Sequence, residues 1–162
     1  MKILTKKECI QILKDVNLPE NIIEHLQAVC DFSMKVVDIV EARGIKVNRN
    51  LVAAAALLHD VKKLSENHEI AGAEYISSLG YPEVAKVIRK HGLSNLNRQD
   101  CMPKTWEERI VFYSDKRLKG NKVVSVNERF TDIEKRYKGS HLKHELEVTK
   151  QLEKELLGNK KI

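Results

Sequence analysis

A histidine and an aspartate stand side by side at the end of an apolar segment. His59 and Asp60 directly follow residues 51–58, in which the positions four residues earlier are Ala55 and Ala56. In a helix, both polar side chains would therefore continue faces that we expect to be buried. Because neighbouring positions differ by about 100° around the helix axis, the two side chains can meet only at a point between them, such as a metal ion. A charge pair at the helix end is the alternative.

Two further polar residues interrupt apolar stripes. His25 follows Ile22 by three residues and precedes Val29 by four, and Asp115 has apolar residues four positions before it and three after it. Such spacing places each side chain on the buried face of a helix. A buried carboxylate is costly unless it is paired or coordinates a metal. His25 could also be a hydrogen-bonded core histidine, and Asp115 could be the partner in a buried salt bridge.

Two more histidines lie at the expected ends of helices. His68 begins a helix in which Gly72, one turn later, would let a backbone or a ligand come close, and His91 ends a helix just before Gly92. His68 could be an ordinary first-turn residue, and His91 could complement the helix dipole. Taken together, these histidines and aspartates offer nitrogen and oxygen ligands without thiolate. This set favours one or two ions of Fe, Mn, Ni, Co or Zn in a catalytic site, and Mg is also compatible.

The elements that must position these residues are all predicted to be helical. Helix-start and helix-end residues divide the chain at about residues 5–16, 19–43, 49–64, 67–80, 82–92, 105–118, 125–137 and 140–157, with a break at Gly139 before the last segment. Capping boxes begin at Thr5, Thr105 and Ser125. No alternating pattern longer than four residues predicts a strand. We therefore predict an all-α, single-domain bundle of about seven helices over residues 1–162, with a core at about 20–120, helices at 125–157 packed on it, and a buried metal site.

The composition indicates one globular domain. The 162 residues are 42% hydrophobic and 32% charged, with a net charge of +6. The charge favours anionic partners, but no interleaved arginine–aromatic patch predicts dedicated nucleic-acid binding. Three cysteines without CxxC spacing indicate free thiols in a reducing compartment. Since the sequence shows neither a signal-peptide pattern nor a run of about 18 apolar residues, we expect a cytoplasmic protein that does not contact membranes.

The ordered pattern H…HD…H…H…D resembles that of the HD-domain metal-dependent phosphohydrolases. The local contexts agree: AALLHDVKK, HEIAGAEYI and IVFYSDKRL are each similar to a family segment. The most similar branch is the small bacterial proteins marked by the motif HDIG, from which this sequence departs with Val61-Lys62 in place of Ile-Gly. The resemblance covers about residues 20–120.

The resemblance implies a helical fold with a metal site buried between its helices. It implies that one ion is held by His25, His59, Asp60 and Asp115. A second ion would be held by His68 and His91, with Asp60 as the bridge. Two such ions can share a hydroxide and clamp a phosphoryl group for in-line displacement. The implied function is hydrolysis of a phosphoester or phosphoanhydride of a nucleotide or similar small phosphate.

Basic residues near the pattern are candidates for binding that phosphate. Lys63 follows His59 by one turn, and we predict that it acts in catalysis with Asp60 by offsetting developing charge. Lys116 and Arg117 are further candidates for phosphate contacts, although all three could be surface residues. His141 and His144 fall outside the pattern, and we expect them to be solvated.

The departures from the family pattern bear on the substrate. His91 is followed by Gly92 rather than by a second histidine, which argues against cyclic dinucleotides, whereas diadenosine tetraphosphate stays open. Two other classes of function also stay open. One is a di-iron oxygenase of the same fold, and the other is a non-catalytic, metal-binding regulatory module.

Overall fold

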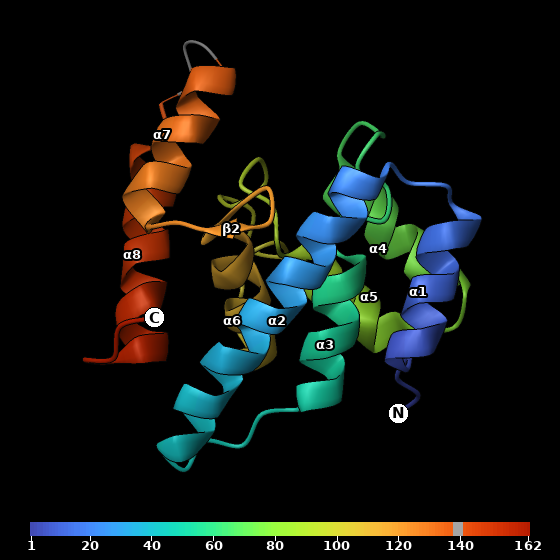
Figure 1. Ribbon diagram of the computed structural model, residues 1–162, viewed down its shortest axis with the longest axis horizontal. Coiled ribbons are helices and arrows are strands. Elements are labelled where there is room, and N and C mark those ends of the chain that lie inside the picture. Colours follow the sequence, from blue (N-terminus) through green and yellow to red (C-terminus); the bar gives the residue numbers. More distant parts are fainter. Residues whose placement is uncertain (138–140) are drawn as a thin grey trace.

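The longest helix, α2 (Glu20–Ala42), crosses the molecule diagonally in the computed structural model (Figure 1). The structure describes residues 1–137 and 141–162. Apolar residues recur along α2 at spacings of three and four, so that Leu26, Val29, Val36 and Val40 are all fully buried. This stripe packs against α3 (Arg49–Leu58), α6 (Trp106–Asp115) and α8 (Lys143–Leu157). One end of the stripe brings His25 toward α6.

The alanine-rich helix α3 lies at the centre of the packing. It contacts α2, α5 (Pro82–Arg89), α6 and α1 (Lys6–Asp15). Ala54, Ala55 and Ala56 are buried, and their small side chains let these neighbours approach closely. α2 and α6 also reach the segment that follows α3, where His59 lies near His25 and Asp115.

A helical pair covers the other side of that segment. α4 (His68–Ser78) packs along α5, and α5 packs on α3 and α6. A methyl group added at Gly72 of α4 would lie 3.3 Å from a Val61 side-chain carbon and 3.5 Å from one of Ile88. The glycine predicted to allow a close approach thus allows α4 to pack tightly against its protein neighbours.

Two helices and a small hairpin complete the described residues. β1 (Leu118–Lys119) pairs with β2 (Lys122–Val123) in an antiparallel sheet, and α7 (Val126–Arg136) follows it. α7 and α8 pack on each other at one side of the molecule, and α8 also packs on α2 and α6 (Figure 1). The predicted break at Gly139 and the predicted helix start at Ser140 lie outside the described residues.

The prediction of an all-α fold is confirmed, with eight helices in the described residues. The three predicted capping boxes are present, each with both of its hydrogen bonds. Two details were wrong. α3 ends at Leu58 rather than near residue 64, since the backbone continues as turns in which Val61 N–H donates to Leu58 and Lys63 N–H donates to Asp60. The hairpin was missed because strands of two residues are too short to show alternation.

Two smaller expectations concern the surface and the thiols. The three cysteines are free thiols, as predicted, and all three are buried. Within the described part of the chain, no helix combines the length and apolar character needed to span a membrane. His141 and His144 are exposed, in agreement with their expected solvation.

Thr105→Ala should destabilise the fold by about 1 kcal/mol, because it removes the side-chain cap of α6. The Thr105 hydroxyl accepts a hydrogen bond from Glu108 N–H at 3.2 Å. Urea denaturation followed by circular dichroism measures the loss. Thr131→Ala, at an exposed position inside α7, is the matched control and should cost nothing. Equal stabilities of the two variants would contradict the role of the cap.

Candidate metal centre

His59 lies at the C-terminal end of α3 and is fully buried. Its Nδ1 lies 2.8 Å from the Ala56 carbonyl oxygen. Because a carbonyl only accepts, Nδ1 carries a proton and donates, so in the neutral ring Nε2 is the nitrogen with the free lone pair. Nε2 lies 3.5 Å from Oδ1 of Asp115 and 3.6 Å from Oδ2 of Asp60, and it has no hydrogen-bond partner among the described residues.

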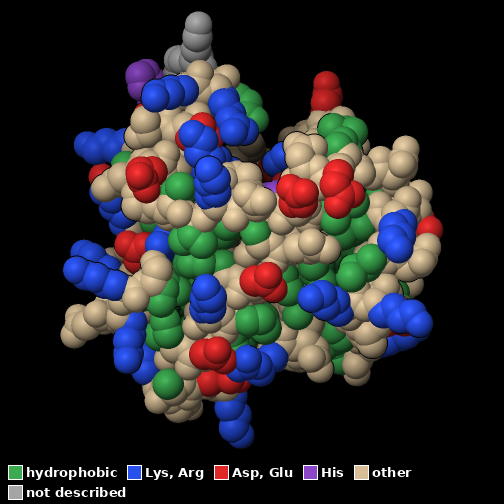
Figure 2. Space-filling view, viewed as in Figure 1, with side chains coloured by type: hydrophobic (Ala, Val, Ile, Leu, Met, Phe, Trp, Pro, Cys, Tyr) green, Lys and Arg blue, Asp and Glu red, His purple; other side chains and the backbone are tan. Residues whose placement is uncertain are grey.

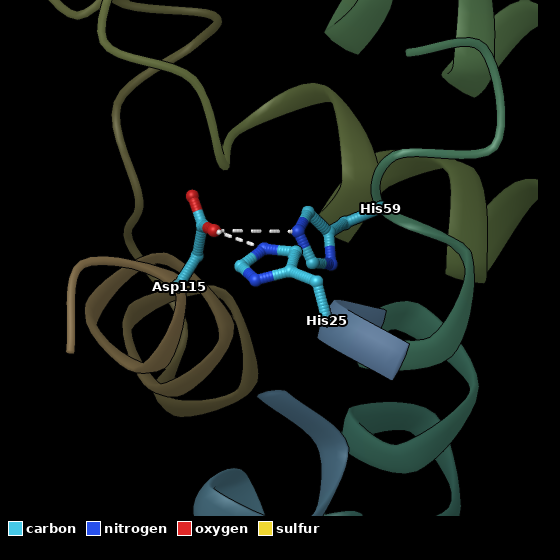
Figure 3. A group of neighbouring side chains, drawn as sticks. All are labelled: His25, His59 and Asp115. Atoms are coloured by element: carbon cyan, nitrogen blue, oxygen red, sulfur yellow. Dashed lines mark hydrogen bonds and ion pairs between the residues drawn. The ribbon is translucent and has the colours of Figure 1, made fainter. Parts of the chain in front are cut away.

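His25 and Asp115 bring α2 and α6 to the same point. His25 Nε2 lies 3.1 Å from Asp115 Oδ1, and Figure 3 shows both histidine rings directed at that carboxylate oxygen. His25 Nδ1 lies 2.6 Å from the carbonyl oxygen of Gly120, at the turn of the β1–β2 hairpin. The small hairpin that the sequence did not reveal therefore orients one of the predicted ligands.

His68 and His91 gather around the other oxygen of Asp60. Their Nε2 atoms lie 3.2 Å and 3.3 Å from Asp60 Oδ1, and 3.3 Å from each other. His91 Nδ1 lies 2.6 Å from the Ile88 carbonyl oxygen, so this ring also directs Nε2 inward. Asp60 thus presents Oδ2 toward His59 and Oδ1 toward the two remaining histidines.

These groups fit divalent metal ions. Two sets have ligand atoms close enough together to hold an ion: His25, His59 and Asp115 form one, and His59, Asp60 and His91 form the other. Two buried atoms within these sets, His59 Nε2 and Asp60 Oδ1, have no hydrogen-bond partner in the described part of the chain. An unpaired lone pair is costly in the interior unless a cation satisfies it. Three rings whose Nδ1 faces a backbone carbonyl also match the outer-shell pattern of metal-bound histidine.

The electrostatics of the cluster keep its carboxylates ionised. Burial raises the pKa of Asp60, but the His59, His68 and His91 side chains together with Lys63 outweigh it and hold that pKa well below its usual value. Burial also raises the pKa of Asp115. The Lys116 ammonium and the His25 and His59 imidazoles outweigh this effect, so the pKa of Asp115 lies well below its usual value.

The histidine pKa values respond to the same charges. Burial lowers the pKa of His25, yet the Asp115 carboxylate more than compensates and the pKa is raised. For His91 burial prevails, and its pKa is lowered despite Asp60. A neutral imidazole is the form that binds a metal, so the environment of His91 favours coordination before any ion arrives.

Two of the predicted basic residues lie beside the cluster. Lys63 Nζ is 3.1 Å from Asp60 Oδ2, and its side chain is 42% exposed. Lys116 is buried; its ammonium donates to Asp115 and, at 2.9 Å, to the His91 carbonyl. Burial lowers the pKa of Lys116 even though Asp115 opposes that effect. Both lysines line a pocket of about 370 Å³ that also contains His68, His91 and Asp115.

This pocket opens between the C-terminal helices and the rest of the fold. α7 and α8 contribute one wall, and the segment after His91 contributes another. Figure 2 shows a notch beside the part of the molecule formed by α7 and α8, with a patch of histidine surface visible in it. The cluster is therefore buried on most sides and reachable from one.

Arg117 lies apart from this pocket. Its guanidinium donates to the Val124 carbonyl at 2.7 Å, to the Tyr113 hydroxyl at 2.6 Å and to the Ile162 carbonyl. After α6 ends, the side chains of consecutive residues diverge, so Lys116 faces the cluster while Arg117 joins the hairpin to α6 and the C-terminal segment. We therefore leave Arg117 out of the proposed phosphate-binding set.

Sequence reasoning missed a buried carboxylate next to the cluster. Glu69 is 2% exposed; its Oε1 accepts from the Asn95 amide at 2.9 Å, and its Oε2 lies 3.5 Å from His68 Nδ1. Gly92 makes room for it, because a methyl group there would lie 2.7 Å from Glu69 Oε1. The signal in the sequence was the acidic residue directly after His68, together with the glycine directly after His91.

Comparison with known proteins identifies the family. The HD domain model matches residues 22–119, so the chain belongs to the HD-domain superfamily of metal-dependent phosphohydrolases. This confirms the resemblance and its span, and members of this family bind divalent metals. The tie to the bacterial branch stays a prediction.

The curated relatives include an uncharacterized protein and two methyltransferases. An uncharacterized protein of Methanocaldococcus jannaschii is 28% identical over 149 residues, covering 83% of this chain and 88% of the relative. tRNA (cytidine(56)-2'-O)-methyltransferases of Picrophilus torridus and Thermoplasma volcanium are 29% and 26% identical, covering 75% and 72% of this chain. The chain spans only 38% and 39% of these two longer proteins. No solved structure matches the chain.

Glu69→Gln should weaken binding of the ion next to His68 by about tenfold or more, because outer-shell partners of metal-bound histidine typically contribute that much. Titration calorimetry of metal-free protein with Mn²⁺ measures the affinity and the number of ions bound. Glu74→Gln, at an exposed position of the same helix, is the matched control. The same Mn²⁺ affinity in both variants would mean that Glu69 plays no part in orienting His68.

Proposed function

We propose that the protein is a metal-dependent phosphohydrolase that cleaves a phosphoester or phosphoanhydride of a nucleotide or similar small phosphate. The observation that carries the proposal is the position of Asp60. One of its oxygens faces His59 and the other faces His68 and His91, all within 3.6 Å. A carboxylate placed between two groups of ligands can hold two ions close together, which two-metal phosphoryl chemistry uses.

The metal set in this proposal is the one predicted from the sequence. His25, His59, Asp60 and Asp115 would hold one ion, and His68 and His91 would hold a second one together with Asp60. Bound divalent ions would lower the pKa of a water molecule and offset the charge of the phosphoryl group. The Nδ1 contacts of His25, His59 and His91 with backbone carbonyls leave Nε2 of each ring as the atom that would hold an ion.

The two lysines have different roles in the proposal. Lys63 is half-exposed and held by Asp60, so its ammonium can turn from that carboxylate to a phosphate oxygen at the mouth of the pocket. Lys116 is buried and anchored to the Asp115 carboxylate and the His91 carbonyl. We assign it to positioning these two residues, with a secondary contribution to the positive potential of the pocket.

The nucleotide class of substrate rests on two supports. The pocket of about 370 Å³ lies in the range that binds small organic molecules. Two relatives are named for methylating a cytidine of tRNA, and a domain shared with such proteins is consistent with a nucleotide-derived phosphate.

Asp60→Asn should lower kcat/KM for a generic aryl phosphate by at least about a thousandfold, because the amide cannot bridge two cations. The assay uses protein loaded with Mn²⁺, Fe²⁺, Co²⁺, Ni²⁺ or Zn²⁺, with circular dichroism to verify folding. Asp31→Asn, an exposed position on α2, is the control. If the wild-type protein hydrolyses no phosphate with any metal, or if the Asp60 variant keeps its rate, the proposal fails. Oxygen consumption by the iron-loaded protein would favour the oxygenase instead.

Lys63→Met should reduce kcat/KM on the order of a hundredfold while leaving the number of bound metal ions unchanged, because it removes only the charge that meets the phosphate. Steady-state kinetics and metal analysis measure the two effects. Lys62→Met is the neighbouring control, since Lys62 lies over the Tyr75 ring instead of facing Asp60. Loss of metal from the Lys63 variant would show that this residue supports the site and does not contact substrate.

A further inference from the structure

The outer wall of the metal-site pocket comes from α7 and α8, beyond the residues that the HD domain model matches. Arg129 and Ile133 of α7 and Leu142 and Glu145 beside and within α8 line it, opposite His68 and His91. The part of the pocket that would contact the rest of a substrate is therefore built by the C-terminal part of this chain.

The Arg129 guanidinium lies in this wall, and its positive charge is only partly balanced by a carboxylate. Its side chain is 14% exposed, and its Nη1 lies 3.3 Å from Oδ2 of Asp132. That carboxylate is shared with Lys119 and Arg136, at 3.2 Å each. The single negative charge of Asp132 is therefore shared by the three positive charges of Lys119, Arg129 and Arg136. Arg129 Nε is buried and has no hydrogen-bond partner among the described residues.

Glu145 provides a hydrogen-bond acceptor in the same wall as the Arg129 donor. Its Oε2 is buried and likewise lacks a hydrogen-bond partner within the described part of the chain. Among the described residues, Arg129 forms an ion pair with Asp132 and none with Glu145. A buried donor and a buried acceptor left unpaired on one wall are costly unless a ligand satisfies them.

Apolar side chains complete the surface. Ile133 is 9% exposed, and Leu142 and Leu93 are partly buried in the same pocket. A ligand for this wall needs an apolar face, an acceptor for Arg129 and a hydroxyl or amino donor for Glu145. A nucleoside offers all three, whereas a second phosphate would be repelled by the Glu145 carboxylate.

We propose that Arg129, Ile133, Leu142 and Glu145 form a subsite that binds the nucleoside of a mononucleotide whose phosphate lies at the metal-binding end of the pocket. Glu145 accepts from a hydroxyl or amino group of the nucleoside, and Arg129 donates to an acceptor on it. The role in substrate choice rests on the proposed hydrolase function, but the binding itself does not.

Nucleoside binding tests the subsite without turnover. The full chain is titrated with adenosine and with cytidine, and NMR chemical shifts follow binding. At least one nucleoside should bind, and Glu145→Gln and Arg129→Lys should each weaken it about fivefold or more. The controls Glu147→Gln and Lys135→Arg lie at exposed positions of the same two helices and should bind like the wild type. Absence of nucleoside binding, or equal binding by all variants, would overturn the subsite.

Substrate preference provides the second readout. The ratio of kcat/KM for a 5'-nucleotide to that for an aryl phosphate should fall about tenfold in Glu145→Gln, mainly through KM, and should not change in Glu147→Gln. An equal loss of kcat/KM on both substrates would mean that Glu145 supports the metal site and does not contact the nucleoside.

The two proposals fail in different ways. If the wild type hydrolyses the aryl phosphate but binds no nucleoside, the subsite is wrong and the hydrolase function stands. If nucleosides bind through Arg129 and Glu145 but no phosphate is hydrolysed with any metal, the subsite stands and the hydrolase function is wrong.

Discussion

The burial of the Asp60 carboxylate is the constraint on which the rest of the structure depends. An ionised carboxylate that is 2% exposed must be compensated by positive charge or by hydrogen-bond donors. Imidazoles and Lys63 surround it, and its Oδ1 still has no hydrogen-bond partner among the described residues. Divalent ions between Asp60 and the histidines would supply the missing compensation. The fold can thus be understood as a set of helices that deliver ligands to both sides of one carboxylate.

Backbone carbonyls orient three of the histidine rings that would bind these ions. Ala56, Ile88 and Gly120 each provide a carbonyl oxygen to the Nδ1 of one histidine. Two of these carbonyls lie three residues before the histidine at the end of a helix, where carbonyl groups lack partners within the helix. The end of a helix is therefore a suitable place for a ligand, since a backbone carbonyl there orients the ring.

In the proposed function, different helices would hold the metal ions and contact the rest of the substrate. The segment from α2 to α6, with the turns between its helices, carries the proposed metal ligands and lies largely within the residues that the HD domain model matches. α7 and α8 lie outside that match and cover the pocket from one side. A scaffold of this kind keeps the reactive centre constant, while changes in the covering helices alter what can bind above it.

The sequence by itself determined the helical fold, the three helix caps and the six residues of the proposed metal set, because these depend on spacing along single helices and on the types of side chain. It could not determine that α3 ends at Leu58, which lets His59 and Asp60 leave the helix axis in turns and face ligands on both sides. Nor could it separate Lys116 from Arg117, or show the contacts of Glu69 and Gly120, which join segments 23 to 95 residues apart. Only tertiary structure brings such segments together, because long-range packing decides which side chains share a cavity.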